Sequence, residues 1–144
     1  MSWVYEISQH GMWYRDTDLR VQLMAQDGLY SGAFGVWQDN PACCGDKDLG
    51  PIFPGNWTMI ELILNHPEMG EYVIRLEPDD ATRAAIIAAG REPDNSFYIH
   101  GERIPPAVPG YASKGCLIAP RTTRESLWNS PDHSLEVVAF RLTA

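Results

Sequence analysis

Glycine and proline recur along the whole chain, and their spacing limits how long any helix or strand can be. The 144 residues include 12 glycines and 11 prolines, which are scattered rather than gathered in one tract. Short extended segments separated by such turn residues are typical of mainly β proteins. Since 44% of the residues are hydrophobic, the chain can also bury a core. We therefore expect residues 1–144 to form a single, mainly β domain with two short helices.

Local patterns predict the main elements of this domain. The clearest strands are expected at 57–64 and 72–76, joined by a hairpin turn. The clearest helix is expected at 79–89, since Asp79 or Asp80 can cap it and Gly90 can end it. A second helix is expected at 120–128, with Pro120 in its first turn. Further strands are expected at 3–9, 12–14, 20–25, 96–100, 117–119 and 135–142, and irregular segments at 30–49 and 104–110.

The charge and hydropathy of the chain exclude several classes of partner. The net charge is −8 and no block of basic residues is present, so neither nucleic acid nor an anionic membrane is an expected partner. No apolar run approaches membrane-spanning length. Residues 1–6 lack the basic and apolar regions of a signal peptide. We expect a protein that is made in the cytoplasm without a signal peptide.

The cysteines point to a free thiol rather than to a disulfide or a metal site. There are three, of which Cys43 and Cys44 are adjacent and Cys116 stands alone. This number is too small for a disulfide scaffold, and no Cys-x-x-Cys pair suggests structural zinc. We therefore expect no metal ion.

Cys116 is a candidate nucleophile, with His100 as its base. A thiol attacks as a thiolate, and at neutral pH a neighbouring imidazole can generate it. His100 ends one predicted strand and Cys116 begins the next, so the loop between them can bring both to one sheet edge. Gly115 permits a tight backbone path whose amides can face a developing oxyanion. Ser113 can hydrogen-bond the imidazole or fix the loop. The alternative from spacing alone is a buried thiol near a hydrogen-bonded core histidine.

The motifs around these residues resemble a known family. His100-Gly101 followed by Ser113-Lys114-Gly115-Cys116-Leu117 resembles the His-Gly…Ser-x-Gly-Cys signature of L,D-transpeptidase catalytic domains. Three earlier motifs are similar to one subgroup, the L,D-transpeptidase-like antibacterial effectors of type VI secretion. They are Tyr30-Ser31-Gly32, the run Gly50-Pro51-Ile52-Phe53-Pro54-Gly55-Asn56-Trp57, and Arg91 before Phe97-Tyr98-Ile99-His100-Gly101.

The resemblance implies a fold, an activity and a site. The fold would be an L,D-transpeptidase-like β-sandwich. The substrate would be a peptidoglycan stem peptide, which Cys116 and His100 cleave or transfer through a thioacyl-enzyme without a cofactor. The residues implied to bind substrate are Tyr30, Ser31, Gly32, Gly101, Arg91 and Arg121. The resemblance also implies secretion, action in the periplasm of a target bacterium, and a cognate immunity protein.

The sequence departs from the family pattern beside the nucleophile. Typical members have histidine where Lys114 stands, and an arginine soon after the cysteine, where Leu117 and Ile118 stand. The carboxylate-binding arginine therefore has no matching position, and Arg121 is its nearest candidate.

Two other functions remain open. One is a catalytically inactive module that binds peptidoglycan, which the missing arginine would suit. The other is a papain-like cysteine amidase or peptidase, in which the histidine follows the cysteine. Here that histidine would be His133.

Overall fold

The computed structural model describes residues 2–102, 110 and 112–140. In these residues, β-strands predominate and two α-helices are present, so the expected mainly β class with two short helices is confirmed. The strands are β1 (Ser2–Glu6), β2 (Gly11–Arg15), β3 (Val21–Ala25), β4 (Tyr30–Ser31), β5 (Gly55–His66), β6 (Gly70–Pro78), β7 (Tyr98–His100), β8 (Leu117–Ile118) and β9 (Ser134–Val138). The helices are α1 (Asp80–Ala88), α2 (Arg121–Asn129) and the short 3-10 helix η1 (Pro41–Cys43).

The predicted elements are found, with differences at their ends. The two clearest predicted strands lie inside the longer β5 and β6, and the helix at 79–89 is α1, whose N-cap Asp79 accepts a hydrogen bond from Thr82 N. The first strand ends at residue 6 rather than 9, because a tight turn follows in which His10 has a φ of 43°. The final strand ends at residue 138, short of the predicted 142, and residues 141 and 142 lie outside the described part. So do residues 104–109 of the expected loop.

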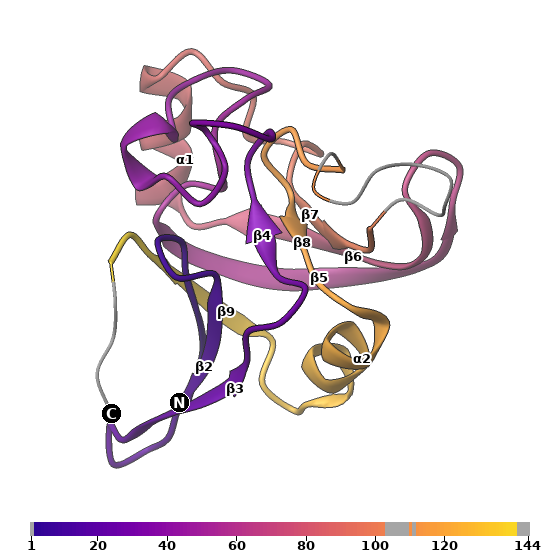
Figure 1. Ribbon diagram of the computed structural model, residues 1–144. Coiled ribbons are helices and arrows are strands. Elements are labelled where there is room, and N and C mark those ends of the chain that lie inside the picture. The colour runs from indigo at the N-terminus through magenta and orange to yellow at the C-terminus, as the bar shows by residue number, and fades with distance from the viewer. Residues whose placement is uncertain (1, 103–109, 111, 141–144) are drawn as a thin grey trace.

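All of the strands pair into one continuous sheet, with the order β3-β2-β1-β9-β5-β6-β7-β8-β4. Two neighbouring pairs are parallel, β1 with β9 and β7 with β8, and the other pairs are antiparallel. Figure 1 shows the long β5 running across the molecule, with β9, β2 and β3 on one side and β4, β7 and β8 on the other. The long β5 therefore joins the two halves of the sheet, because its first residues pair with β9 and almost its whole length pairs with β6.

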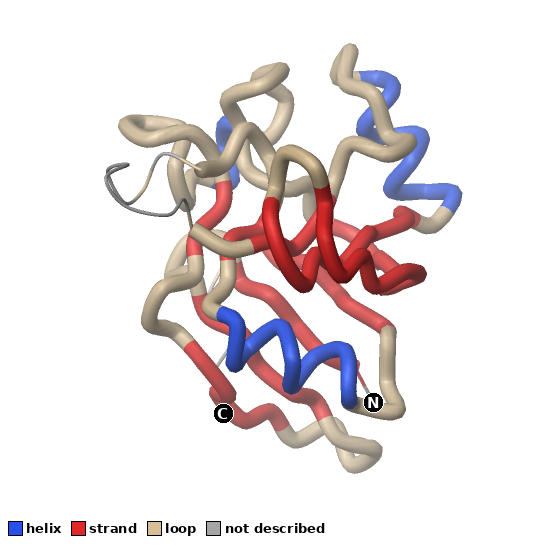
Figure 2. Tube along the Cα trace, turned by 90° about the vertical axis from the view of Figure 1, so that its right-hand side faces the viewer, coloured by secondary structure: helices blue, strands red, loops and turns tan. Residues whose placement is uncertain are grey.

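The two halves of the sheet share one hydrophobic core. Trp3, Tyr5 and Met12 from one half pack in the same cluster as Met59 and other side chains from the second half. This packing of one half on the other is the interior expected of a β-sandwich. Helix α2 covers the core from outside and buries Leu127, and Figure 2 shows it lying across the strands.

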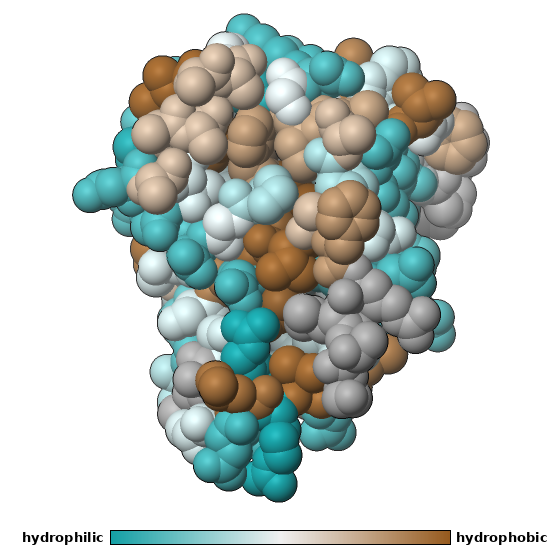
Figure 3. All heavy atoms as spheres, turned by 90° about the vertical axis from the view of Figure 1, so that its left-hand side faces the viewer, coloured by the Kyte–Doolittle hydropathy of each residue, from teal (hydrophilic) through white to brown (hydrophobic). Residues whose placement is uncertain are grey.

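The surface mixes polar and apolar groups. On the face in Figure 3, brown apolar atoms form groups that polar atoms separate. Exposed apolar side chains include Leu23 and Met24 of the edge strand β3 and Ile87 of α1. Among the described residues, no helix is long and apolar enough to span a membrane.

Candidate active site

A pair of short parallel strands brings His100 and Cys116 to one place. In the pairing of β7 with β8, Ile99 lies opposite Leu117 and His100 lies opposite Ile118. Side chains two residues apart on a strand share a face, so Cys116, just before β8, lies on the same face as His100. Both side chains are buried, with 7% of Cys116 and 5% of His100 exposed.

Both residues line one cleft of about 450 Å³, which we call the Cys116 cleft. Its lining residues come from three parts of the chain: the hairpin between β5 and β6, the end of β7, and the segment that leads into β8. They are Glu68, Met69, Gly70, His100, Gly101, Glu102, Ala112, Lys114 and Cys116. The cleft is in the size range of sites for small ligands and short peptides.

Two serine hydroxyls hold the turn that carries Cys116, the candidate nucleophile. Ser113 Oγ donates to the carbonyl of Cys116 at 2.7 Å and accepts from Gly115 N at 3.1 Å and Gly32 N at 3.0 Å. Ser31 Oγ donates to the same Cys116 carbonyl at 3.0 Å and accepts from Ile52 N at 2.9 Å. Of the two roles expected for Ser113, the structure shows that it fixes the loop.

Arg91 supports the same turn from behind. Its guanidinium donates to the carbonyls of Cys44 at 2.6 Å, Pro51 at 3.1 Å and Lys114 at 3.5 Å, and it lies over the Phe97 ring. Burial lowers the pKa of Arg91, although nearby thiols and carboxylates counter this. Because its donors are used by the protein itself, we assign Arg91 a supporting role, unlike the substrate-binding role that the resemblance implies.

Gly115 is required by its close contact with Arg91. The residue has a φ of +134°, which only glycine adopts readily, and a Cβ there would lie 2.3 Å from Arg91 Nη2. The amide of Gly115 donates to Ser113 Oγ. It is therefore already engaged and does not face the Cys116 cleft as a free oxyanion donor.

The Cys116 thiol is protonated in this arrangement. Burial raises its pKa to about 11, and the amide of Tyr98 and the charge of Arg91 only partly oppose this. The thiol donates to the carbonyl of Ser96 at 3.7 Å. Among the hydrogen bonds of the described residues, none joins this thiol to the His100 ring. Proton transfer from this thiol to the imidazole would therefore require the thiol to turn away from the Ser96 carbonyl.

The hydrogen bond of the His100 ring defines which of its nitrogens carries the proton. Its Nδ1 lies 2.9 Å from the carbonyl oxygen of Gly101, and because a carbonyl only accepts hydrogen bonds, Nδ1 carries the proton. Nε2 of the neutral ring is then free to take a proton. Burial lowers the pKa of His100, and the charge of Arg124 lowers it further, while the hydrogen bond to Gly101 opposes them. The imidazole is therefore neutral at pH 7.

Tyr30 organises the neighbouring wall. Its hydroxyl donates to Glu102 Oε1 at 2.7 Å and accepts from Ala112 N at 3.0 Å, while Glu102 Oε2 accepts from Gly110 N at 2.9 Å. Glu102 and Ala112 line the Cys116 cleft, whereas Tyr30 lines an adjacent cavity of about 540 Å³. The Tyr30-Ser31-Gly32 motif thus lies beside and behind the turn that carries Cys116.

The β5–β6 hairpin forms a wall of the cleft that the sequence did not predict. His66 Nδ1 accepts hydrogen bonds from Glu68 N and Met69 N, both at 3.1 Å, and so orders the turn. The ring of His66 also meets the Tyr98 ring edge-on, with centroids 5.6 Å apart. No local signal indicates this role of His66, because it depends on where the hairpin lies relative to β7.

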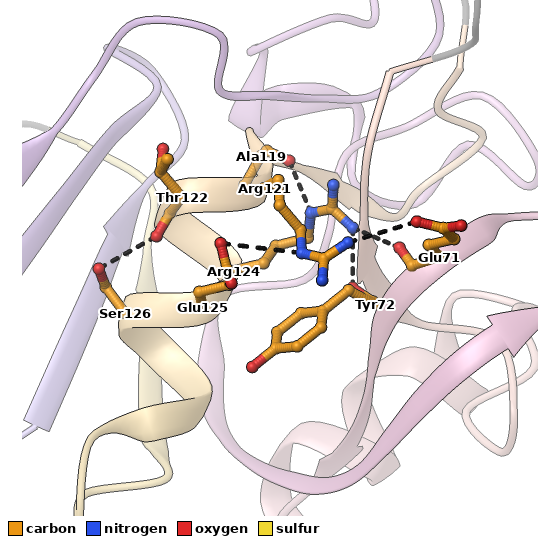
Figure 4. A network of polar contacts seen from close by, with 8 residues as sticks. All are labelled: Glu71, Tyr72, Ala119, Arg121, Thr122, Arg124, Glu125 and Ser126. Atoms are coloured by element: carbon orange, nitrogen blue, oxygen red, sulfur yellow. Dashed lines mark hydrogen bonds and ion pairs between the residues drawn. The ribbon is translucent and has the colours of Figure 1, made fainter.

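The two arginines of α2 have different environments, shown in Figure 4. Arg124 is buried, and its guanidinium donates to the carbonyls of Ala119, Glu71 and Tyr72 at 2.7–3.0 Å. Arg121 is half exposed, and it pairs with Glu71 at 3.4 Å and lies over the Tyr72 ring. Arg121, the candidate carboxylate ligand, is absent from the lining of the Cys116 cleft.

Gly101 connects Arg124 to the cleft. A Cβ on Gly101 would lie 2.7 Å from Arg124 Nη2, so a larger residue there would require the guanidinium to shift. The resemblance implied that Gly101 binds substrate, but the sequence did not indicate that a buried arginine lies behind it.

The structure places the other chemical candidates away from this cleft. His133 stacks on Trp128 and its Nε2 lies 2.8 Å from the Trp128 carbonyl, so nothing brings it to Cys116 as a papain-like arrangement requires. Cys43 and Cys44 are free thiols, and Cys44 is buried. Among the described residues, no group of histidine, cysteine and carboxylate side chains could hold a metal ion.

The mainly β fold with a cysteine–histidine cleft can be compared with known proteins. Neither a protein-family model nor a curated protein sequence matches the chain. The solved structure of Bdellovibrio bacteriovorus Bd1075 is similar, with a TM-score of 0.56 and 11% identity over 96% of this chain and 48% of that one. An L,D-transpeptidase from Mycobacterium smegmatis has a TM-score of 0.47 and 15% identity over 95% of this chain and 58% of that one.

The chain thus spans about half the length of these structures. At such identities, the likeness to Bd1075 concerns the fold alone. The type VI secretion subgroup stays a prediction from the motifs.

Proposed function

We propose that this chain is a cysteine enzyme that cleaves or transfers peptidoglycan stem peptides. The observation that carries the proposal is the pairing of β7 with β8, which sets the Cys116 thiol and the His100 imidazole on one face and in one cleft. The ordered motif resemblance to L,D-transpeptidases supplies the substrate class. A fold can host many activities, so the argument depends on this site.

The geometry suits a thioacyl mechanism. Nε2 of His100 takes the thiol proton, and the Cys116 sulfur attacks the carbonyl that joins the third, diamino acid residue to a terminal D-alanine. The C–N bond breaks, and the imidazolium gives its proton to the leaving amine. Water, deprotonated by His100, then releases the shortened stem as a carboxylic acid. An amine acceptor in place of water would yield a new amide.

Purified muropeptides test the proposal. Wild-type protein should convert disaccharide tetrapeptides to tripeptides with release of D-alanine, as followed by mass spectrometry. Cys116→Ala should abolish this conversion, and His100→Gln should reduce it strongly. Tetrapeptides that stay intact with folded wild-type protein, with and without an added amine acceptor, would overturn the proposal.

A second function is favoured by one observation. The Cys116 thiol is hydrogen-bonded to the Ser96 carbonyl instead of to His100, and its pKa is raised to about 11. Both features suit an inactive module that binds peptidoglycan. Such a module would bind purified cell wall equally well as wild type and as Cys116→Ser, and it would form no covalent adduct with a stem peptide.

We further propose that the protein acts as a type VI secretion toxin in the periplasm of a target bacterium. A cognate immunity protein would protect the producer by covering the Cys116 cleft. The support is the resemblance of the motifs to effectors of this kind. Directing the chain to the periplasm of a test bacterium should slow growth, and Cys116→Ala should relieve the effect. Equal growth with both forms would contradict the proposal.

A further inference from the structure

Ser31 lies on an edge strand, and its backbone is held by one aspartate. In the described part of the chain, β4 is the last strand of the sheet and pairs only with β8. Ser31 N donates to Asp39 Oδ1 at 3.2 Å, and Asp39 N donates to the Ser31 carbonyl at 2.8 Å. The segment between them returns closely on β4, because a Cβ on Gly32 would lie 2.6 Å from the Trp37 carbonyl oxygen. Asp39 therefore clamps both backbone polar groups of Ser31.

The same carboxylate is tied to a turn in the other half of the sheet. Asp39 Oδ2 lies 3.2 Å from Nδ1 of His10, which lies in the turn between β1 and β2. Burial raises the pKa of Asp39, but its contacts with Ser31 and His10 oppose this and favour the ionised form. An ionised carboxylate only accepts hydrogen bonds, so Nδ1 of His10 carries the proton. Each oxygen of the carboxylate thus has its own donor.

Asp39 and His10 both have backbone conformations that most side chains avoid. The φ of Asp39 is 55° and that of His10 is 43°, in the left-handed region. The two residues are 29 positions apart and contact each other directly. Strained conformations of this kind persist only where the surrounding structure holds them. The contact between two such residues therefore indicates that the fold keeps the pair in a fixed position.

Ser31 connects this pair to the turn that carries Cys116. Its side chain is fully buried, and its hydroxyl donates to the Cys116 carbonyl at 3.0 Å. Neither Asp39 nor His10 lines the Cys116 cleft. Any effect of the pair on the thiol must therefore act through Ser31.

We infer that Asp39 and His10 are positioning residues for Cys116, which act through the Ser31 hydroxyl. This inference rests on the proposed function and deepens it, since it names residues outside the cleft that hold the thiol for reaction. Attack on a carbonyl is sensitive to displacements of about 1 Å. Loss of the pair should therefore lower kcat for stem-peptide cleavage and leave KM nearly unchanged.

Glycine substitutions test this inference without adding backbone strain. Asp39→Gly removes the carboxylate at a φ that glycine adopts readily. Asp48→Gly is the matched control, because Asp48 lies in the same irregular segment, has a φ of 61° and exposes its side chain. We expect Asp39→Gly to lower kcat on the order of tenfold and Asp48→Gly to leave it unchanged. His10→Gly should cause a smaller loss, since Ser31 then keeps its contacts with Asp39.

A conservative variant and a measurement independent of activity separate positioning from general stability. Asp39→Asn keeps an oxygen acceptor for the Ser31 amide and should retain most of kcat. Hydrogen exchange followed by mass spectrometry should show faster exchange of residues 113–118 in Asp39→Gly, with α2 exchanging as in wild type. Both Asp39→Asn and Asp48→Gly should exchange at the wild-type rate in both segments.

The outcomes separate this inference from the proposed function. If wild type cleaves stem peptides but Asp39→Gly leaves kcat or the exchange of residues 113–118 unchanged, the positioning role is wrong and the enzyme stands. Faster exchange throughout the Asp39→Gly chain also overturns the inference, because Asp39 would then stabilise the domain in general. If the local change in exchange appears but wild type processes no muropeptide, the pair still holds the turn that carries Cys116, and the enzymatic proposal fails.

Discussion

At the scale of single residues, the turn that carries Cys116 depends on two hydroxyl groups that meet at one carbonyl oxygen. Ser31 and Ser113 both donate to the carbonyl of Cys116, and each also accepts a backbone amide from another segment. Arg91 adds a third support from behind. The turn that carries this thiol is thus held by residues up to 85 positions away in the sequence.

Ser113→Ala should destabilise the protein. The change leaves the amides of Gly32 and Gly115 without their acceptor in a buried place, which costs about 1–3 kcal/mol of the free energy of unfolding. Denaturant unfolding followed by circular dichroism measures it. Ser126→Ala is the control, because that exposed hydroxyl donates only to Thr122 within α2. Equal effects of the two changes would contradict the role of Ser113.

The raised pKa of Cys116 predicts slow alkylation at neutral pH. Since its pKa is about 11, the rate of labelling by iodoacetamide should climb with pH toward that value rather than level off near 9. Peptide mapping by mass spectrometry distinguishes Cys116 from Cys43, the more accessible thiol. A plateau of Cys116 labelling below pH 9 would show that the thiolate is already stabilised in the free protein.

The lowered pKa of His100 predicts the pH below which the proposed activity should decline. A base must be unprotonated, so kcat/KM should decline only as the pH drops through a pKa below 6.5, the ordinary value for histidine. The acid limb of the profile for stem-peptide cleavage gives this pKa. An acid limb above 6.5 would indicate that the imidazole is charged more easily than its burial implies.

At the scale of elements, individual helices and strands can be predicted from local patterns better than the pairing of distant strands can. Helix α1 and the strands β5 and β6 follow from capping residues and apolar spacing, which are local signals. The proximity of His100 and Cys116 was expected because the loop between the two predicted strands can bring both residues to one sheet edge. The hairpin wall of the cleft was not expected, since it depends on the pairing of β6 with β7.

The environments of the arginines also could not be read from the sequence. A charged side chain near a motif indicates a ligand or a solvated surface, and in either case exposure. Arg91 and Arg124 instead lie buried against backbone carbonyls. Such burial depends on which backbone carbonyls the tertiary fold leaves without other hydrogen-bond donors. No local sequence pattern predicts which carbonyls these are.

A change in the β5–β6 hairpin should affect the binding of substrate and not the chemical step. His66→Ala removes the acceptor that orders the amides of Glu68 and Met69, so KM for the stem peptide should rise while kcat changes little. His66→Asn offers a shorter side chain with an oxygen acceptor and should restore part of the binding. A fall in kcat with KM unchanged would instead place His66 in the chemical step.

Helix α2 should contribute strongly to stability through one side chain. Leu127 is fully buried in the core, so Leu127→Ala should lower the free energy of unfolding by about 2–5 kcal/mol. Ile87→Ala on α1 is the control, because that side chain is 58% exposed. Thermal unfolding measures both, and a similar Tm for the two variants would contradict the packing of α2.

At the scale of the whole molecule, the order of strands in the sheet differs from their order in the chain. Strand β9 lies between β1 and β5, so segments from the two ends of the described chain are neighbours at the centre of the sheet. This arrangement is a property of the complete sheet, and the separate strand patterns do not indicate it.

Removal of β9 should therefore prevent the whole domain from folding, rather than leave a shorter folded domain. A chain that ends at Ser130 leaves β1 and β5 without their shared neighbour, and it should lose cooperative thermal unfolding by circular dichroism. A chain that ends at Phe140 retains β9 and serves as the control. Cooperative unfolding of the shorter chain near the Tm of the longer one would contradict the central role of β9.

The central position of β9 has a consequence for biosynthesis. While the ribosome is still translating the segment that becomes β9, the nascent polypeptide holds β1 and β5 without the strand that joins them. Closure of the sheet must then wait until Ser134–Val138 have been translated, a long-range step of the kind that makes β topologies fold slowly. During this interval the emerging chain exposes unpaired strand edges, which makes it a natural client for chaperones.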